Sequence, residues 1–378
     1  MEYFRAMNLS YWEIKSWLTN IDYTIVGSGI VGLNCALNLK ERFPKANILV
    51  IEKGTLPQGA STKNAGFACF GSLSEIISDL SNSNEAQVFS LVKTRVMGLK
   101  RLRKLVGTQL IDFQEHGGFE LFLKQDTALF EKCLQHKNTI NTLLKPLFKT
   151  EVFSEINTPK TFKEVLPYTF FNAFEGQLDT GKLMQALLKK ARAKGIALFN
   201  GAEIKAVNET STSVCLEFAS GATINTNYAF VATNGFAKEI LKVSVKPARA
   251  QVLITEKIPN LNLQGTYHLD RGYYYFRNVG NRILLGGGRQ LDIQGETTTK
   301  LQTTAEIQHA LEQILFKTII PNKTPVITDR WSGIMGVGTQ KTPIVKPISS
   351  RVFCGVRLGG MGVAIGSQVG ADLANLLP

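Results

Sequence analysis

The sequence predicts an α/β protein of two domains, one built on a parallel sheet and the other, of α+β type, on a mainly antiparallel sheet. The chain has 378 residues, more than a single core usually supports. A short apolar strand near the N-terminus leads directly into a glycine-rich turn and a helix. Alternating strand patterns fill much of residues 246–328, which favours an antiparallel sheet there.

The first element is the apolar strand 21–26, and the turn after it reads Gly27-Ser28-Gly29-Ile30-Val31-Gly32 before a helix that runs to about residue 41. Gly27 permits the tight turn, Gly29 lets a pyrophosphate approach the backbone, and Gly32 lets the helix pack on the strand. The free N–H groups at the start of the helix then face the phosphates. This order of elements predicts a Rossmann-like site for an adenine dinucleotide.

A second strand, 47–51, ends at Glu52 and Lys53, twenty residues after the last glycine of the turn. A carboxylate at this position accepts hydrogen bonds from the ribose hydroxyls, so Glu52 completes the site. An acid here also argues against a 2′-phosphate.

A second small-residue loop follows, with the sequence Gly59-Ala60-Ser61-Thr62-Lys63-Asn64-Ala65-Gly66. Together with the glycine turn it resembles the D-amino-acid-oxidase-like family of FAD-dependent oxidoreductases, which includes glycine oxidase, sarcosine oxidase and the γ-glutamylputrescine oxidases. The resemblance covers nearly the whole chain and implies FAD as the cofactor. The family usually has arginine where Lys63 stands, so the charge is kept but the bidentate fork is lost.

The resemblance extends to later segments and implies further FAD contacts from them. Four later segments match the family pattern: a strand near residue 204, a strand 228–235 that ends in a family-like turn, the segment Trp331-Ser332-Gly333, and a glycine turn before the last helix. In relatives the N–H groups of that last helix face the edge of the flavin where negative charge appears on reduction. The implied contacts are Ile204, Thr233, Gly333, Gly359, Gly360, Met361, Gly362 and Val363.

The sequence departs from the family at three further positions, and it also differs from the covalent relatives. Met361 stands where relatives often have histidine, and Ala364 replaces a lysine that helps to hold the substrate carboxylate in sarcosine oxidases. Leu284 replaces the lysine that those enzymes place beside the flavin for oxygen. Gly333 lies in the stretch where covalent relatives carry a flavin-attached cysteine, so we expect noncovalent FAD.

We expect a discontinuous FAD-binding domain, residues 1–80, 170–245 and 329–378, and a substrate domain, residues 81–169 and 246–328. The substrate domain holds a predicted hairpin on a Gly280-Asn281 turn, whose alternation sends Tyr273, Tyr275 and Arg277 to one face. The candidate catalytic and substrate-binding residues are Tyr275, Arg277, Arg357 and Met361, and Arg249 is a further candidate carboxylate clamp. A half-exposed sheet face is the alternative interpretation of the hairpin.

The expected reaction is oxidation of a C–N bond in a small amine or amino acid, with a hydride passing to FAD and water hydrolysing the imine. A dehydrogenase with an acceptor other than oxygen stays open, because position 284 holds leucine. Two other classes also stay open: a tRNA-modifying enzyme acting on an amine of a base, and a protein that binds FAD without catalysis.

The net charge of +13 suits an anionic ligand, nucleic acid or simple solubility. Residues 93–104 predict an amphipathic helix with a basic outer face, so nucleic acid is a possible but not favoured partner. The five cysteines have no metal or disulfide spacing, and the four histidines are dispersed, which predicts free thiols and structural or surface histidines. No apolar run has the length of a signal peptide or a spanning helix, so we expect a cytoplasmic protein without a membrane partner. The sequence does not indicate the oligomeric state.

Overall fold

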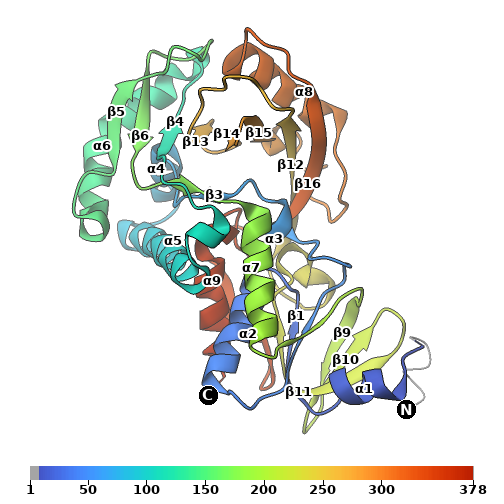
Figure 1. Cartoon of the computed structure of the whole chain (residues 1–378). Coiled ribbons are helices and arrows are strands. Elements are labelled where there is room, and N and C mark those ends of the chain that lie inside the picture. Colours follow the sequence, from blue (N-terminus) through green and yellow to red (C-terminus); the bar gives the residue numbers. More distant parts are fainter. Residues whose placement is uncertain (1–7, 378) are drawn as a thin grey trace.

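The computed structural model describes residues 8–377. The expectation that the N-terminal segment holds no targeting signal therefore falls partly outside the described residues. Two eight-stranded sheets dominate the fold. In Figure 1 the first sheet and its helices form the lower half of the molecule and the second sheet forms the upper half. A short two-strand ladder, β3 (Phe67–Ala68) with β7 (Gly176–Gln177), completes the strands of the described residues. The predicted α/β fold with a second sheet domain is confirmed.

The first sheet has a parallel centre. Its order is β18 (Val352–Val356), β11 (Thr223–Val231), β1 (Ile21–Val26), β2 (Ile48–Ile51) and β8 (Ala197–Phe199). Strand β17 (Ile344–Pro347) adds an antiparallel edge beyond β18, and the β9 (Ile204–Glu209) and β10 (Val214–Phe218) pair extends from the first half of β11. Because the carboxyl ends of β1, β2 and β11 meet at one edge, the loops that follow them converge there.

Helices cover one face of this sheet. They are α2 (Ile30–Arg42), α9 (Gly362–Ala374), α7 (Thr180–Ala193) and α5 (Glu85–Val106). Alternate residues of the buried strands face this layer, among them Ile25, Val50 and Phe230. Their neighbours, such as Val26 and Ile51, face the opposite side and pack with the β9–β10 pair. Both faces of the central strands are therefore buried, which explains their continuous apolar runs.

The second sheet is antiparallel except between β13 and β4. Its order is β16 (Ile327–Val337), β12 (Lys246–Thr255), β15 (Arg282–Gly287), β14 (Tyr274–Val279), β13 (Thr266–Leu269), β4 (Gly118–Glu120), β6 (Tyr168–Asn172) and β5 (Phe153–Asn157). Strands β14 and β15 form the predicted hairpin on Gly280-Asn281. The outer face packs on α8 (Ala305–Ile314) and the π-helical turn Leu315–Ile319 that follows it.

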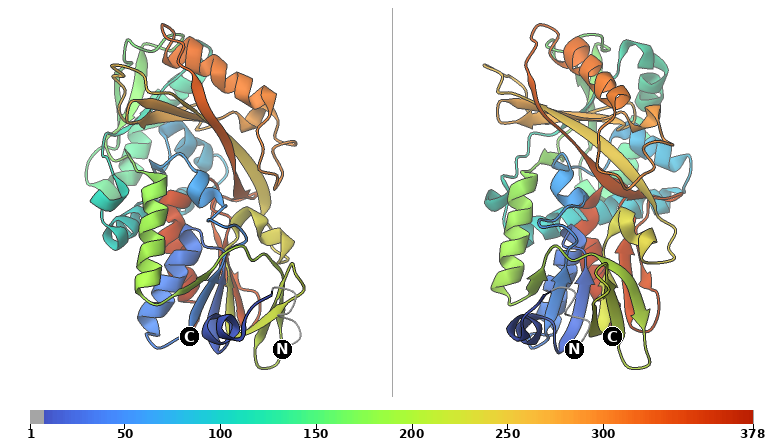
Figure 2. Two further views of the ribbon diagram at one scale, coloured as in Figure 1. Left: turned by 45° about the vertical axis from the view of Figure 1, so that its right-hand side comes forward. Right: turned by 90° about the vertical axis from the view of Figure 1, so that its right-hand side faces the viewer.

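Four further helices belong to the described residues (Figure 2). Helices α4 (Leu73–Leu80) and α6 (Thr127–Phe148) share a core with α5 and with strands β5 and β6. Short helices α1 (Tyr11–Trp17) and α3 (Ala60–Lys63) lie near the N-terminus and in the second predicted loop. Single 3₁₀ turns occupy 109–111, 124–126, 234–239 and 289–291.

The expected domain boundaries stay a prediction: β16 crosses one of them, and α5 packs on the domain to which it was not assigned. Strand β16 pairs with β12 along most of its length, from Val337 opposite Lys246 to Ile327 opposite Thr255, so the expected boundary at residue 328 falls inside a strand of the second sheet. Helix α5, expected in the substrate domain, packs against α9 of the first domain, where Ser367 Oγ donates to the Gly98 carbonyl at 2.6 Å.

The expectation that the whole 93–104 basic stretch faces outward is wrong in part. Arg95 is buried and its Nη1 donates to the Phe70 carbonyl at 2.8 Å. Arg101 donates to Asn38, and Arg103 forms an ion pair with Glu115 at 2.7 Å. Three of the six cations, Lys93, Lys100 and Lys104, are exposed on α5. The helix therefore carries a much smaller basic face than its sequence predicts.

All five cysteines are free thiols, and four of them are buried. Within residues 8–377 there is no cluster of acids, histidines and cysteines arranged to hold a metal ion. No helix in that part of the chain has both the length and the apolar character needed to cross a bilayer. The cytoplasmic location stays a prediction.

Candidate functional site

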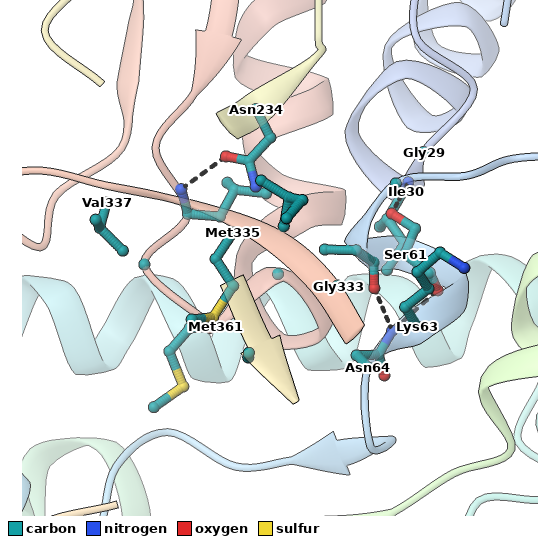
Figure 3. Close-up of a pocket in the computed structure, with 18 of the residues that line it drawn as sticks. Gly29, Ile30, Ser61, Lys63, Asn64, Asn234, Gly333, Met335, Val337 and Met361 are labelled. Atoms are coloured by element: carbon teal, nitrogen blue, oxygen red, sulfur yellow. Dashed lines mark hydrogen bonds between the residues drawn. The ribbon is translucent and has the colours of Figure 1, made fainter. Parts of the chain in front are cut away.

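A cavity of about 560 Å³ lies between the two sheets, and both predicted domains contribute to its walls. Its floor is the edge of the first sheet where β1, β2 and β11 end, and its roof is the inner face of the second sheet. Figure 3 shows the floor residues Gly29, Ile30 and Ser61 on one side and Met335 and Met361 on the other. The predicted dinucleotide motif and the predicted hairpin therefore meet at one place.

The glycine turn forms a cradle at the start of α2. Gly27 has φ +106°, a conformation that side chains disfavour, and a Cβ at this position would lie 2.9 Å from the Ala232 carbonyl oxygen. A Cβ on Gly32 would lie 1.9 Å from the Gly27 carbonyl oxygen, so only glycine lets α2 begin this close to β1. Gly29 is the N-cap of α2 and has no side chain to cover the free N–H groups. Apart from the Ile30 N–H, which donates to Ser61 Oγ, the helix terminus is thus open to an anionic group such as a pyrophosphate.

Glu52 follows β2 and its carboxylate is fixed by its neighbours. Its Oε2 accepts from Ser28 Oγ at 2.8 Å and from the Ser28 N–H at 3.2 Å. Its Oε1 accepts from the Gly54 N–H at 3.1 Å. The side chain lines the cavity beside Lys53 and Ile204, where a ribose and adenine would lie.

The second predicted loop is tied to the first. Ser61 Oγ accepts from the Ile30 N–H at 2.9 Å, which fixes the short helix α3 against the start of α2 (Figure 3). Asn64 closes the loop: its Nδ2 donates to the Ser61 carbonyl at 2.9 Å, and its Oδ1 accepts from the Gly66 N–H at 2.8 Å. Lys63 lines the cavity opposite Gly333, where a Cβ would lie 3.0 Å from the Lys63 side chain.

Asn234 anchors the glycine turn before α9. Its Oδ1 accepts from the backbone N–H groups of Arg357 at 3.1 Å and Leu358 at 3.3 Å, and Figure 3 marks one hydrogen bond of this amide oxygen. The turn then passes through Gly359 and Gly360, which both have positive φ, and opens α9 toward the cavity. Asn234 therefore holds this turn in place.

Strand pairing decides which side chains form the roof, because residues directly opposite each other share a face. Val252 lies opposite Trp331 and Gly286, and Gly286 lies opposite Tyr275. Tyr275 in turn lies opposite His268. This face is apolar and aromatic above the cavity, and Phe67 packs edge-on against both rings, with centroids 5.5 Å from Tyr275 and 5.3 Å from His268.

His268 belongs to a buried polar network at one end of the roof. Its Nε2 lies 2.9 Å from Glu175 Oε2, which also accepts from Thr266 Oγ1 at 2.9 Å. Nearby Glu120 accepts from Ser72 Oγ at 2.8 Å. Burial opposes protonation of the imidazole, but the charge and hydrogen bond of Glu175 outweigh it and raise the pKa of His268 to about 9. His268 therefore carries a positive charge at neutral pH.

Tyr275 and Met361 line the cavity, as two of the candidate catalytic residues. Burial raises the pKa of Tyr275 to about 12, so its phenol stays neutral. Met361 Sδ lies 3.9 Å from the thiol of Cys69, another cavity residue, and burial raises the pKa of that thiol well above its usual range.

The three arginines proposed as substrate clamps lie outside the cavity lining, because each has other partners. Arg277 is on the cavity-facing side of β14, but its guanidinium donates to the carbonyls of Ala65, Leu178 at 2.9 Å and Asn278 at 3.0 Å. Arg357 Nε donates to the Thr342 carbonyl at 2.9 Å. Arg249 pairs with the buried carboxylate of Glu296 at 2.6 Å. None of these clamps is supported by the geometry.

Most of the predicted cofactor contacts lie in the cavity lining: Gly27, Gly29, Ile30, Glu52, Lys53, Ser61, Lys63, Asn64, Ala65, Ile204, Thr233, Gly333, Gly359, Gly360, Met361, Gly362 and Val363. Four do not. Ser28 supports Glu52, Gly32 packs α2 on β1, Thr62 Oγ1 donates to the Pro57 carbonyl at 2.6 Å, and the Gly66 carbonyl accepts from the Leu178 N–H at 2.9 Å. These four shape the site from behind.

Several lining residues escaped the sequence-based prediction, among them Phe67, Glu75, His268, Arg289 and Met335. Strand alternation could have pointed to His268, because it lies directly opposite Tyr275 and shares its face of the sheet. That pairing joins β13 to β14 in a register that the sequence alone does not specify. The α4 residue Glu75 has no such signal, because a capping box explains it equally well.

The departures from the family pattern have structural explanations. Leu284 is 5% exposed and packs with Ala65 and Val252, so the position is filled by an apolar side chain beneath the second loop. Ala364 is buried in α9, where its carbonyl lies close to Gly98 of α5. The residue is 1% exposed, so a long side chain there would have to displace buried neighbours.

The residues present fit FAD. The cradle at α2, the fixed carboxylate of Glu52 and the open turn before α9 lie along one cavity. Thr233 Oγ1, in the cavity lining, is buried and has no hydrogen-bond partner within residues 8–377, which suits a polar ligand atom.

A family model described as "FAD dependent oxidoreductase" (DAO) matches residues 22–376. No curated protein matches the chain. The solved structures that resemble it include glycine oxidase from Geobacillus kaustophilus, 20% identical with a TM-score of 0.76 over 94% of each chain. L-Proline dehydrogenase from P. horikoshii is 18% identical, with a TM-score of 0.73 over 94% of this chain and 93% of its own. Iminodiacetate oxidase from Chelativorans sp. BNC1 is 18% identical, with a TM-score of 0.75 over 94% of each chain. Likeness at these identities shows a shared fold, whereas the family match extends over nearly the whole sequence, and the chain therefore belongs to the FAD-dependent oxidoreductase (DAO) family.

Proposed function

We propose that this enzyme oxidises the C–N bond of a small amine or amino acid, and that the resulting imine is hydrolysed by water. One observation carries the proposal: the apolar and aromatic face of the second sheet covers the cavity that the glycine cradle, Glu52 and the start of α9 line. A small molecule between that roof and the isoalloxazine ring would be held out of water. Bound FAD supplies the acceptor for the hydride, and the protein supplies orientation and a dry pocket.

The residues of the roof suit this work. Val252 and Phe67 line the cavity without a charge, and Tyr275 offers a neutral hydroxyl. At one end His268 presents a positive charge that Glu175 balances from behind. The start of α9 lines the cavity, where its N–H groups would stabilise negative charge on a reduced flavin.

The names of structurally similar proteins support the proposed substrate class. Glycine, proline and iminodiacetate, after which three of them are named, are small molecules with a C–N bond. FAD is proposed to bind without a covalent link, because the stretch 333–335 contains no cysteine.

The proposal is tested by anaerobic titration of the purified, FAD-loaded protein with D-amino acids, N-methyl amino acids, imino acids and polyamines. We expect one class to bleach the flavin absorbance in proportion to the amount added. A flavin that dithionite reduces but no member of the panel bleaches would contradict the proposal. Such a result would favour a protein that binds FAD without this chemistry.

Admitting air to the reduced protein distinguishes an oxidase from a dehydrogenase. Leu284, an apolar residue packed beneath the second loop, favours slow reoxidation by oxygen and an acceptor of another kind. Recovery of the flavin band within seconds would instead identify an oxidase.

The nucleic-acid alternative receives less support from the structure than from the sequence, because three of the six cations in 93–104 contact other groups of the protein. Fluorescence anisotropy with labelled tRNA, measured as a function of salt, tests it. Tight binding with a steep salt dependence would revive the alternative.

A further inference from the structure

Two arginines line the cavity, Arg271 and Arg289, and neither was singled out by its sequence context. Arg271 is 51% exposed and already pairs with Asp270 at 2.9 Å. Arg289 differs, since its Nε is buried and has no hydrogen-bond partner within residues 8–377. No ion pair between described residues includes it either.

The backbone fixes the position of Arg289. Strand β15 ends at Gly287, with φ +127°, and Gly288 follows with φ +78°, so the chain turns sharply out of the sheet just before the arginine. A Cβ on Gly287 would lie 2.0 Å from the Tyr273 carbonyl oxygen, so a larger residue cannot replace it without a shift of the backbone. The Gly288 N–H donates to the same carbonyl at 3.0 Å.

The next residue reinforces this placement. Gln290 Nε2 donates to Asp270 Oδ2 at 3.3 Å, which joins the loop after β15 to the turn between β13 and β14. Arg289 is thereby held at the edge of the roof, beside Tyr273. Other arginines of the second sheet contact protein groups instead. Arg249 pairs with Glu296, Arg277 donates to three carbonyls, and Arg282 donates to the Thr255 carbonyl.

A buried guanidinium nitrogen without a partner is costly, so an unsatisfied group of this kind in a binding cavity calls for an explanation, and a bound ligand is one. Guanidinium binds carboxylates strongly through charge-assisted, often bidentate hydrogen bonds. From this geometry we infer that Arg289 binds the carboxylate of the substrate, which makes an amino acid rather than a polyamine the substrate class. The inference rests on the proposed function for the identity of the ligand.

The test measures binding rather than turnover. Benzoate and its neutral counterpart benzamide are titrated into the FAD-loaded protein, and the change in the flavin absorbance band gives each dissociation constant. We expect Arg289→Gln to weaken benzoate binding at least about tenfold and Arg289→Lys to weaken it less, while benzamide is unaffected. Arg282→Gln, at the start of β15 and outside the cavity lining, is the matched control and should stay within about twofold.

Three results would overturn the inference: undiminished benzoate binding by Arg289→Gln, a loss found in Arg271→Gln instead, or a wild-type protein that does not bind benzoate. A fall in FAD affinity of Arg289→Gln without a change for benzoate would also do so, since the arginine would then contact the cofactor. If Arg289→Gln does not fold, Arg289→Lys decides, because unchanged benzoate affinity against benzamide would reject a bidentate contact. Benzoate binding that depends on Arg289 in a protein that no amine reduces would leave this site standing and reject the proposed function.

Discussion

Arg277 lies on the cavity-facing side of its strand, as predicted, but its guanidinium contacts the protein and not the cavity. Its guanidinium lies under the second loop and donates to the carbonyls of Ala65 and Leu178. Burial lowers its pKa to about 10, which reflects how far it is removed from water. It connects the roof to a loop of the floor, and so it is a positioning residue for the FAD site.

Replacing Arg277 with methionine should weaken FAD binding at least about tenfold and reduce the free energy of unfolding by about 2–4 kcal/mol, because buried carbonyls lose their donors. FAD affinity is measured by the quenching of flavin fluorescence, and stability by urea unfolding of the apoprotein. Arg282→Met, whose guanidinium donates to the Thr255 carbonyl at a partly exposed site, is the control. Equal FAD affinity in both variants would show that Arg277 does not position the loop.

His268 gives the protein a pH-dependent stability. Its folded pKa of about 9 exceeds the ordinary value of 6.5, so the protonated imidazole stabilises the folded state fully below about pH 6.5. This contribution is lost as the pH rises through about 9.

We therefore expect the wild-type protein to lose stability between about pH 6.5 and pH 9 relative to His268→Gln, measured by urea unfolding at several pH values. The exposed His136, replaced by glutamine, serves as the control and should leave the slope unchanged. Parallel pH profiles for the wild type and His268→Gln would disprove the assigned charge. The slope is informative even though removing the imidazole leaves Glu175 buried without its partner.

At the scale of elements, the contact between α2 and α9 depends on small residues. A Cβ on Gly370 would lie 2.6 Å from the Val31 carbonyl oxygen and 2.6 Å from Asn34 Cβ. Both obstacles belong to α2, and one is backbone, which cannot move without shifting the helix. Because α2 begins at the phosphate cradle and α9 at the glycine turn, this contact sets the distance between two walls of the cavity.

Gly370→Ala should reduce the free energy of unfolding by about 2–4 kcal/mol through overpacking, and should also weaken FAD binding. Urea unfolding and flavin fluorescence measure the two effects. Gln368→Ala, in the same helix and partly exposed, should change stability by no more than about 0.5 kcal/mol. A stable Gly370→Ala variant with normal FAD affinity would mean that the helices can separate without cost.

The elements differ in how well their sequence predicts them. Strand β1, the turn after it and α2 were predicted with their ends nearly correct, because each depends on local chemistry. The extent of β16 was not predicted, since its pairing with β12 crosses some eighty residues of sequence. The basic face of α5 was overestimated for a related reason: Arg95, Arg101 and Arg103 find partners on other elements.

At the scale of the whole molecule, the cavity belongs to neither domain alone. The first sheet contributes the cradle and Glu52, while β12, β14 and β16 contribute the roof. Arg277 and Trp331 also tie the roof to the second loop, the former through the Ala65 carbonyl and the latter through a 2.9 Å hydrogen bond to the Lys63 carbonyl. A ligand that fills the cavity should therefore stabilise both halves together.

Removing FAD should lower the free energy of unfolding by about 2.7 kcal/mol relative to protein with free FAD at a hundredfold excess over Kd. Differential scanning calorimetry measures this change. Hydrogen exchange should show that FAD protects both residues 27–32 and strand β12 (Lys246–Thr255). Protection confined to the first sheet would indicate that the roof does not respond to the cofactor.

The sequence by itself determined the FAD-binding half of this protein: the cradle from Gly27 to Gly32, the acid at Glu52 and the loop from Gly59 to Gly66. These features lie within a few residues of the strands that position them, so local spacing is enough to reveal them. The tertiary structure alone decided which arginine remains available to a ligand. Arg249, Arg277 and Arg357 are engaged by groups distant in sequence, whereas Arg289 is not, and such pairings arise only when the two sheets come together.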